Sequence, residues 1–386
     1  MKIQTGNAVR GDDYFNRKNL INQAWDLLEA GSHILIAAPR RVGKTSLMYY
    51  LQDNPQEHYC FLYMITESVN NENEFYRRMV NKVLKTNFLK NSKKIIAFLE
   101  KHQPKIKKVG LDGIEFGVGD KLDYREMLIK ILKSPGAEYQ KLIIMVDEFP
   151  ETLENIIEDE GEGAGKHFLQ SNRELRQNLE ISKNVQFIYT GSIGLENIVS
   201  KLNIVKTIID LSRLKIPPLK LTEAKQLIIL LLENVEFDIS DSIMEYILKK
   251  VEWLIPFYIQ LLIDELRNLH RDTHLDKISE DTVNQAIAEM LEQRQHFEHW
   301  HTRLRSSMKK SEYNFAKELL NILSENETID SNELFNLAVK HGLEETYKDV
   351  VGSLIYDGYI NNHDDIKVYR YNSPILRMWW RQNVAN

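Results

Sequence analysis

The chain has 386 residues, of which 43% are hydrophobic and 27% are charged, a balance that excludes a disordered or collagen-like protein. Its formal charge of −6 argues against a protein that coats nucleic acid, but it is compatible with a local basic site. The single cysteine excludes an intramolecular disulfide, and the longest aliphatic run, 227–232, is far too short to cross a bilayer. We therefore expect a cytoplasmic protein of two or three domains, without a membrane segment.

The first half of the chain alternates between helical and strand-like patterns. Short apolar runs of the kind that form strands buried on both faces occur at 34–37, 60–65, 141–146, 185–190 and 207–211. Amphipathic patterns predict helices at 17–30, 45–52, 72–85, 122–134 and 166–180. The acid- and glycine-rich stretch 159–165 is expected to be a flexible loop. Strands that alternate with helices predict a parallel sheet with helices on both faces.

An insertion is expected at about 86–121. Between 85 and 108 it carries eight lysines and one acid, Glu100, and four glycines then punctuate a predicted hairpin around 114–116. The lysine segment is either a contact for nucleic acid or the solvated face of an amphipathic helix.

The second half of the chain changes character after Pro217 and Pro218. Helices are predicted at 222–233, 240–251, 256–270 and 281–296. Residues 308–386 then read as three helices and a hairpin at about 357–371, an order typical of a winged helix.

A phosphate-binding loop is the clearest motif. Residues 38–45 match the pattern GxxxxGK[ST], with Ala38 in place of the first glycine, between a predicted strand and a predicted helix. Backbone amides of such a loop face phosphates, Lys44 bridges the β- and γ-phosphates, and the Thr45 hydroxyl ligates Mg²⁺. Gly43 keeps a side chain away from the phosphates. The loop residues that we expect to contact nucleotide are Pro39, Arg40, Arg41, Val42, Gly43, Lys44, Thr45 and Ser46.

Two acids end the most apolar predicted strand. Asp147 is expected to hold Mg²⁺ and Glu148 to activate the attacking water, although acids at this place could also simply begin a polar loop. Glu148 directly after Asp147 favours hydrolysis over transfer to another acceptor. Since no guanine-recognition motif follows Lys44, ATP or dATP is the expected nucleotide.

Three further residues have two interpretations each. Ser192 follows the fourth predicted strand and could contact the γ-phosphate or the lytic water, or could cap the next helix. Arg173 and Arg176 are three residues apart and share one helix face. Either could be an arginine finger, while a solvated charged face is the more common role.

Several segments in order resemble the archaeal-type P-loop ATPase family, which is related to the origin-recognition (AAA+) ATPases and the STAND signalling NTPases. They are 15–17, 38–45, 147–148, 190–192 and 217–219, together with the ending 369–380. The resemblance implies that Phe15 and Arg17 lie near the adenine and that Pro256 belongs to a nucleotide-contacting lid motif. In that motif Leu254 stands where the family has glycine.

We therefore expect an α/β fold: an AAA+-like P-loop NTPase domain with a parallel sheet, a helical lid and a C-terminal winged helix. The expected boundaries are 1–216, 217–300 and 301–386. The expected function is that of a slow, regulatory, Mg²⁺-dependent ATPase, a molecular switch that couples ATP and ADP binding to a protein partner or to self-association. The alternative is an ATP-controlled DNA-binding protein of the initiator or transposition-helper type. Residues 297–386 hold 11 Lys and Arg against 13 Asp and Glu, which disfavours DNA readout by the winged helix.

Overall fold

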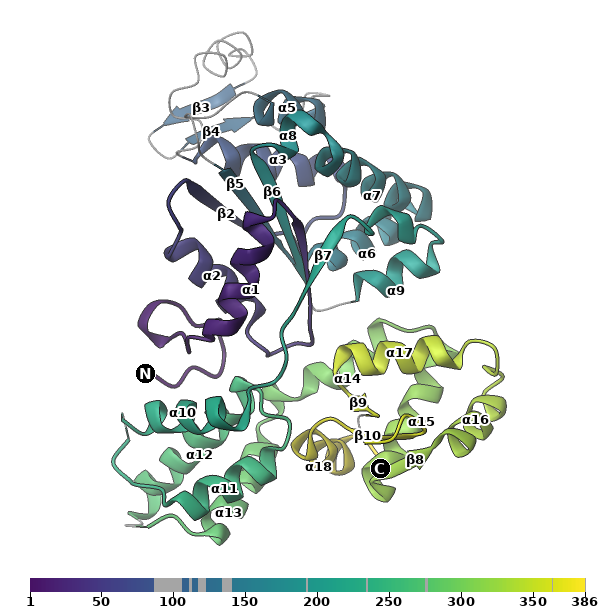
Figure 1. Cartoon of the computed structure of the whole chain (residues 1–386). Coiled ribbons are helices and arrows are strands. Elements are labelled where there is room, and N and C mark those ends of the chain that lie inside the picture. Colours follow the sequence, from purple (N-terminus) through teal and green to yellow (C-terminus); the bar gives the residue numbers. More distant parts are fainter. Residues whose placement is uncertain are drawn as a thin grey trace. The chain divides into compact units, whose positions relative to one another are not determined.

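The computed structural model describes residues 1–86, 106–110, 113–116, 123–133, 141–191, 194–233, 235–274, 277–362 and 364–385. The chain divides into two compact units (Figure 1). The first unit contains Met1–Phe15, Pro39–Gly43 and Pro217–Asn386, and the second contains Asn16–Ala38 and Lys44–Ile216.

The second unit is built on a five-stranded sheet in the order β2-β5-β6-β1-β7, in which every neighbouring pair is parallel. The inner strands β5 and β6 are almost wholly buried, which is why their sequences are continuous apolar runs. The strands are β1 (His33–Ala37), β2 (Tyr59–Ile65), β5 (Lys141–Asp147), β6 (Val185–Gly191) and β7 (Leu211–Lys215).

Four of the five predicted strands lie where expected, but the position of the fifth was wrong. The stretch predicted as a strand at 207–211 begins in a 3₁₀ turn, Val205–Thr207, and the strand starts only at Leu211. β7 lies at the edge of the sheet, and of its five residues only Leu211 and Leu214 are buried. An edge strand of this kind lacks the continuous apolar run on which the prediction relied.

Helices flank this sheet, as predicted (Figure 1). The expected flexible loop at 159–165 is wrong, because α6 and α7 are separated by Gly161 alone, with φ +89°. Gly165 lies where α7 packs on α6, and a Cβ there would stand 2.4 Å from Cγ1 of Ile157. The glycines thus permit a tight junction of two helices. The helices are α1 (Lys18–Glu29), α2 (Lys44–Asp53), α3 (Glu72–Leu84), α5 (Tyr124–Leu132), α6 (Phe149–Glu160), α7 (Glu162–Gln177), α8 (Leu179–Ser182) and α9 (Leu195–Lys201).

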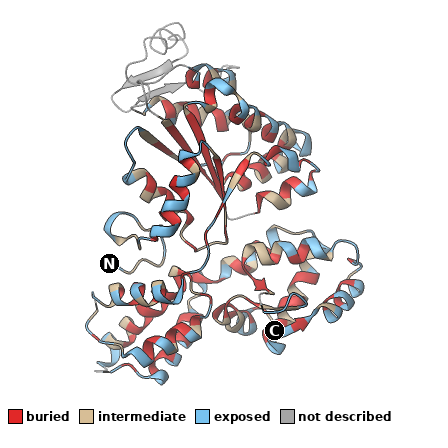
Figure 2. Cartoon of the chain, in the orientation of Figure 1, coloured by how far each residue is buried: buried red, intermediate tan, exposed pale blue. Residues whose placement is uncertain are grey.

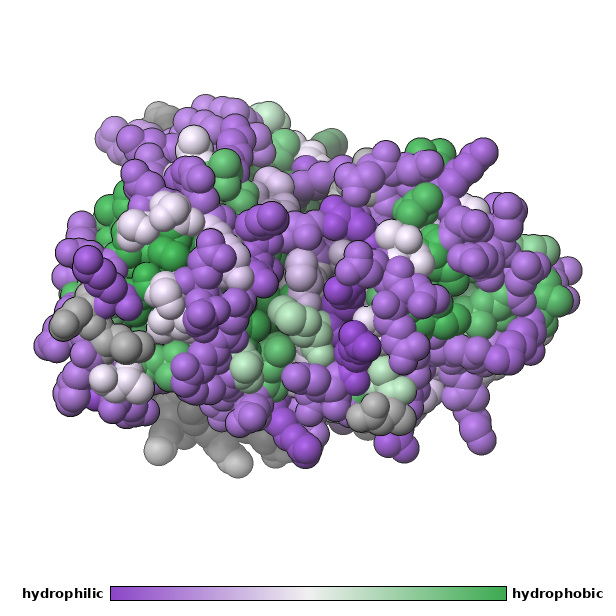
Figure 3. Space-filling model, turned by 90° about the horizontal axis from the view of Figure 1, so that it is seen from below, coloured by the Kyte–Doolittle hydropathy of each residue, from purple (hydrophilic) through white to green (hydrophobic). Residues whose placement is uncertain are grey.

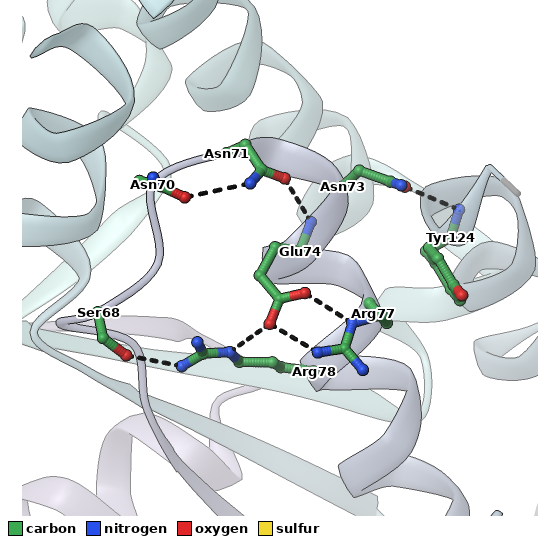
Figure 4. A network of polar contacts seen from close by, with 8 residues as sticks. All are labelled: Ser68, Asn70, Asn71, Asn73, Glu74, Arg77, Arg78 and Tyr124. Carbon is green, nitrogen blue, oxygen red and sulfur yellow. Dashed lines mark hydrogen bonds and ion pairs between the residues drawn. The ribbon is translucent and has the colours of Figure 1, made fainter. Parts of the chain in front are cut away.

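A polar network fixes the start of α3, next to the end of β2 (Figure 4). The Asn71 side chain accepts a hydrogen bond from the Glu74 backbone N–H at 2.8 Å and so caps the helix. The Glu74 carboxylate accepts bonds from Arg77 and Arg78, and Arg78 also donates to the Ser68 hydroxyl. These arginines, Arg77 foremost, lower the pKa of Glu74.

The predicted hairpin of the insertion is confirmed, since β3 (Ile106–Gly110) and β4 (Gly113–Phe116) pair antiparallel. Most of the lysine-rich segment lies outside the described residues.

The first unit begins with helices and ends in the order typical of a winged helix. Its small sheet has the strand order β8-β10-β9, and both neighbouring pairs of strands are antiparallel. The strand β8 and the last helix were not predicted. The helices are α10 (Leu221–Leu232), α11 (Asp241–Val251), α12 (Pro256–Thr273), α13 (Glu280–Glu292), α14 (Glu298–Ser306), α15 (Lys310–Asn326), α16 (Ser331–Lys340), α17 (Tyr347–Asp357) and α18 (Pro374–Asn383), and the strands are β8 (Thr328–Asp330), β9 (Ile360–Asn361) and β10 (Val368–Tyr371).

Buried apolar side chains occur in both units (Figure 2). Trp379 and Trp380 of α18 are core residues, and the Trp380 indole N–H donates to Asn321 Oδ1 at 2.8 Å. Among the described residues, no helix combines the length and apolar character needed to cross a membrane.

Candidate nucleotide site

The predicted phosphate loop connects β1 to α2, as the motif requires. The Lys44 ammonium is buried and donates a hydrogen bond to the Ala38 carbonyl oxygen at 2.9 Å. Gly43 has φ +97°, a conformation that a residue with a side chain rarely adopts. Ala38 has no positive φ, so alanine fits where the motif usually has glycine.

The Asp147 carboxylate lies beside the Thr45 hydroxyl. The hydroxyls of Thr45 and Tyr63 both donate to Asp147 Oδ2, at 2.9 and 2.7 Å. Burial raises the pKa of Asp147, and the bond from Tyr63 opposes that shift. Burial beside Asp147 also raises the pKa of Tyr63.

This donor set fits Mg²⁺. A carboxylate and a hydroxyl oxygen lie within hydrogen-bond distance of each other, and Mg²⁺ at nucleotide sites takes few protein oxygens together with phosphate oxygens and water. Tyr63 was not predicted as a site residue. It reaches Asp147 because β2 and β5 pair in register, with Ile65 opposite Asp147, and only that register could have revealed it.

Glu148 adopts an unusual backbone conformation at the start of α6, with φ +57° and ψ +37°. A non-glycine residue in this left-handed region costs roughly 1–2 kcal/mol. The surrounding bonds hold it there: Asp147 O accepts from the Thr66 hydroxyl at 3.0 Å, and Glu148 O accepts from Thr152 N at 3.1 Å. Non-glycine residues held in this way cluster at functional sites.

The Glu148 side chain reaches the end of β6. Its Oε2 lies 3.5 Å from the position that a Cβ on Gly191 would occupy, and Cδ of Pro150 lies 2.4 Å from the same position. Gly191 therefore gives the acidic turn room beside β6. Thr190 is buried, and its hydroxyl donates to the Ile36 carbonyl at 3.4 Å. The predicted site residue Ser192 lies outside the described residues.

Within the first unit, the middle of the phosphate loop packs against C-terminal residues. Arg41 has φ +68°, and its guanidinium lies 4.4 Å from the centre of the Phe257 ring, a cation–π contact. Its Nη1 lies 3.5 and 3.4 Å from the carbonyl oxygens of Thr5 and Gly6. Burial, and then the neighbouring Arg40, lower the pKa of Arg41.

The turn after α17 also meets this loop. Gly358 has φ +86°, and a Cβ there would lie 2.8 Å from Cη2 of Trp253 and 3.0 Å from Cβ of Pro39. Nearby, Arg303 and Asp357 form a buried ion pair with a distance of 2.9 Å.

Several cationic groups of the first unit act on His299. Burial, followed by Arg41, Arg40 and Arg303, lowers the pKa of His299 to about 3. His299 is therefore neutral at physiological pH.

The other predicted site residues lie as follows. Pro256 starts α12, a position that proline favours, and its neighbour Phe257 is the residue that meets Arg41. Arg17 is buried at the start of α1, and Phe15 is half-buried. Ser46 and Val42 are buried as well.

Neither interpretation of Arg176 is correct. Its side chain is only 2% exposed, and its Nε pairs with Asp210 Oδ2 at 2.7 Å while Nη2 donates to the Thr207 carbonyl. It is neither a solvated residue nor a free finger, but it ties α7 to the turn before β7. Arg173 on the same helix is half-buried.

Comparison with known proteins defines the fold. No profile of a known protein family matches the chain, and no curated protein matches it. Among solved structures, it is similar to the Walker-type ATPase PABY2304 of Pyrococcus abyssi, with 16% identity, a TM-score of 0.66 and coverage of 99% of this chain and 100% of that one. The chain has the fold of this ATPase. The ORC2 protein of Aeropyrum pernix, solved in ADPNP–ADP complexes, is also similar, with 13% identity, a TM-score of 0.54 and coverage of 97% and 96%.

Both similarities span nearly the full length of each chain. They confirm the predicted fold class, a parallel-sheet P-loop domain followed by a helical segment and a C-terminal winged helix. At these identities the similarity concerns the fold.

Proposed function

We propose that this chain binds ATP with Mg²⁺ and hydrolyses it slowly, as a molecular switch coupled to a protein partner. The observation that carries the proposal is the hydrogen bond between Thr45 and Asp147, next to the buried amine of Lys44. It brings two cation ligands and a phosphate-binding group, from the start of α2 after β1 and from the end of β5, to one place at the edge of the sheet. The similarity to an ORC2 protein solved with ADPNP and ADP supports a nucleotide at this place.

Each residue of the site has a distinct role in the proposal. Lys44 exchanges the Ala38 carbonyl for phosphate oxygens, and the first amides of α2 donate to the same phosphates. Thr45 and Asp147 hold Mg²⁺, which neutralises charge on the phosphates. Glu148 accepts a proton from the attacking water.

The loop contacts of the first unit support coupling. Phosphates bound in the loop would contact the segment that contains Pro39 and Arg41. Arg41 contacts Phe257, and Pro39 lies close to Gly358, which in turn lies close to Trp253. Nucleotide binding and the packing of these C-terminal residues are then linked, and such linkage is reciprocal. We assign the lid to 217–300 and the winged helix to 301–386.

Two variants test the site. Lys44→Ala should abolish ATP binding measured with a fluorescent ATP analogue, because it removes the phosphate-binding amine. Glu148→Gln should bind ATP normally and lose turnover, because an amide cannot accept the proton. Equal phosphate release by wild type and Glu148→Gln would disprove the role of Glu148.

The alternative, ATP-controlled DNA binding, draws support from the shared fold with an ORC2 protein. It predicts that affinity for duplex DNA falls steeply with salt and disappears when the lysines between 85 and 108 become glutamates. Absence of salt-sensitive binding, with and without ATP, would reject it.

A further inference from the structure

The winged helix exposes an apolar stripe along α16. Phe335 and Val339 are one turn apart and are 43% and 50% exposed. The Phe335 ring packs edge-on against Tyr347 at the start of α17, with 5.8 Å between ring centroids. In the view from below, one of several hydrophobic patches lies on the right, the side on which Figure 1 draws α16 (Figure 3).

The wing adds one exposed apolar residue near the first turn of α16. The Lys367 carbonyl accepts bonds from the backbone N–H and hydroxyl of Ser331, both at 2.8 Å, so the wing joins the first turn of α16. The residue before it, Ile366, is 76% exposed. Ile366, Phe335, Val339 and Tyr347 together form what we term the α16 stripe.

Acidic residues near Tyr347 in the sequence form what we term the acidic border of the α16 stripe. From 341 to 369 the sequence has six acids and two bases. Glu344, Glu345 and Asp349 are exposed next to Tyr347, and within the described part of the chain none of the three makes an ion pair. Their charge is therefore available to a partner.

We infer that the α16 stripe and its acidic border form a docking surface for a basic amphipathic helix of a partner protein. The apolar stripe suits the apolar face of such a helix, and its Lys or Arg residues would meet Glu344, Glu345 and Asp349. Duplex DNA is the wrong partner, because its phosphates would face like charge. The inference names the partner surface of the proposed switch and depends on the proposed function only for the link to nucleotide.

The test uses the full chain without nucleotide and fluorescence anisotropy. The probe is a labelled designed helix of about five turns, roughly 18 residues, with Leu on one face and Lys on the other. A second probe has Glu in place of every Lys, and a third is labelled duplex DNA. The Lys probe should bind, the Glu probe should not, and binding should weaken with salt.

Matched variants locate the site. Glu344→Lys with Glu345→Lys should lower affinity for the Lys probe at least about tenfold. The control, Glu158→Lys with Glu160→Lys on α6, changes net charge equally and should have less than a twofold effect. Phe335→Ser should weaken binding several-fold, while Ile229→Ser, at a 53% exposed position on α10, should not.

Equal effects of the two charge-reversal pairs, or tighter binding of DNA than of the Lys probe, would overturn the inference. Circular dichroism establishes that each variant is folded. Lys44→Ala is measured as a separate variant. It should bind the Lys probe as the wild type does, because the assay contains no nucleotide. A failed ATPase assay therefore leaves this surface testable, and a failed probe assay leaves the nucleotide site untouched.

Discussion

Gly358 and Gly342 offer a controlled test of whether the winged helix packs on the phosphate loop. Both follow a helix of the winged helix with positive φ, +86° and +66°. The two helix ends are closed by the same pair of backbone hydrogen bonds. After α17 they run from Gly358 N to Ile355 O and from Tyr359 N to Leu354 O, and after α16 from Gly342 N to Val339 O and from Leu343 N to Ala338 O. They differ in surroundings, because a Cβ on Gly342 meets nothing within 4 Å.

The magnitudes follow from this difference. Alanine at either position costs roughly 1–2 kcal/mol for the left-handed backbone. At Gly358 the added methyl would also lie 2.8 to 3.1 Å from Trp253 and Pro39. Overlap of this kind in a packed site costs about 1–3 kcal/mol more. We expect the free energy of unfolding to fall about twice as far in Gly358→Ala as in Gly342→Ala.

Urea unfolding followed by fluorescence and circular dichroism measures the free energies of unfolding. A fluorescent ATP analogue measures nucleotide affinity in the same variants. Because Pro39 belongs to the phosphate loop, Gly358→Ala should also weaken nucleotide binding several-fold, while Gly342→Ala should leave it unchanged. Indistinguishable stability and affinity in the two variants would show that the contact with Pro39 does not constrain the loop.

Three further predictions concern the second unit. Asp210→Asn should lower the free energy of unfolding by about 3–5 kcal/mol in urea titrations, because it leaves the buried Arg176 charge without its carboxylate. Glu196→Gln, which removes the partner of the exposed Arg213, should cost less than about 1 kcal/mol. Burial lowers the pKa of His33 to about 4. Between pH 6.5 and 4 the unfolded chain therefore binds a proton at His33 and the folded chain does not. Stability should therefore fall between pH 6.5 and 4, and this fall should be shallower in His33→Gln. Tyr63→Phe should raise the Mg²⁺ concentration needed for half-maximal ATPase activity, because Asp147 loses a bond that favours its ionised form; an unchanged Mg²⁺ titration would refute this role.

The sheet was largely predictable because its inner strands obey one simple rule. Strands buried on both faces must be apolar throughout, so β5 and β6 are visible in the sequence. β7 escaped because an edge strand needs no such run. The helix junction at Gly161 was not predicted, because the sequence does not distinguish a glycine that permits close helix packing from one that permits flexibility.

The site was predictable where local motifs determine it. Lys44 and Thr45 follow from a loop of fixed length, and Asp147 follows from the strand it ends. Tyr63 and Phe257 were missed because their contacts depend on strand register and on residues far apart in the chain. Sequence spacing carries no information about such contacts.

Arg176 and Asp147, two of the buried charged residues of the second unit, show how structure separates a functional group from a structural one. Arg176 has its opposite charge in place, with Asp210 at 2.7 Å, so its burial is already compensated. Asp147 makes no ion pair among the described residues; its carboxylate accepts bonds from two neutral hydroxyls, and burial raises its pKa. Burial without a paired cation favours protonation, and a bound divalent cation would reverse that preference. Mg²⁺ should therefore bind more tightly as pH rises through the pKa of Asp147, whereas no ligand is needed to keep Arg176 charged.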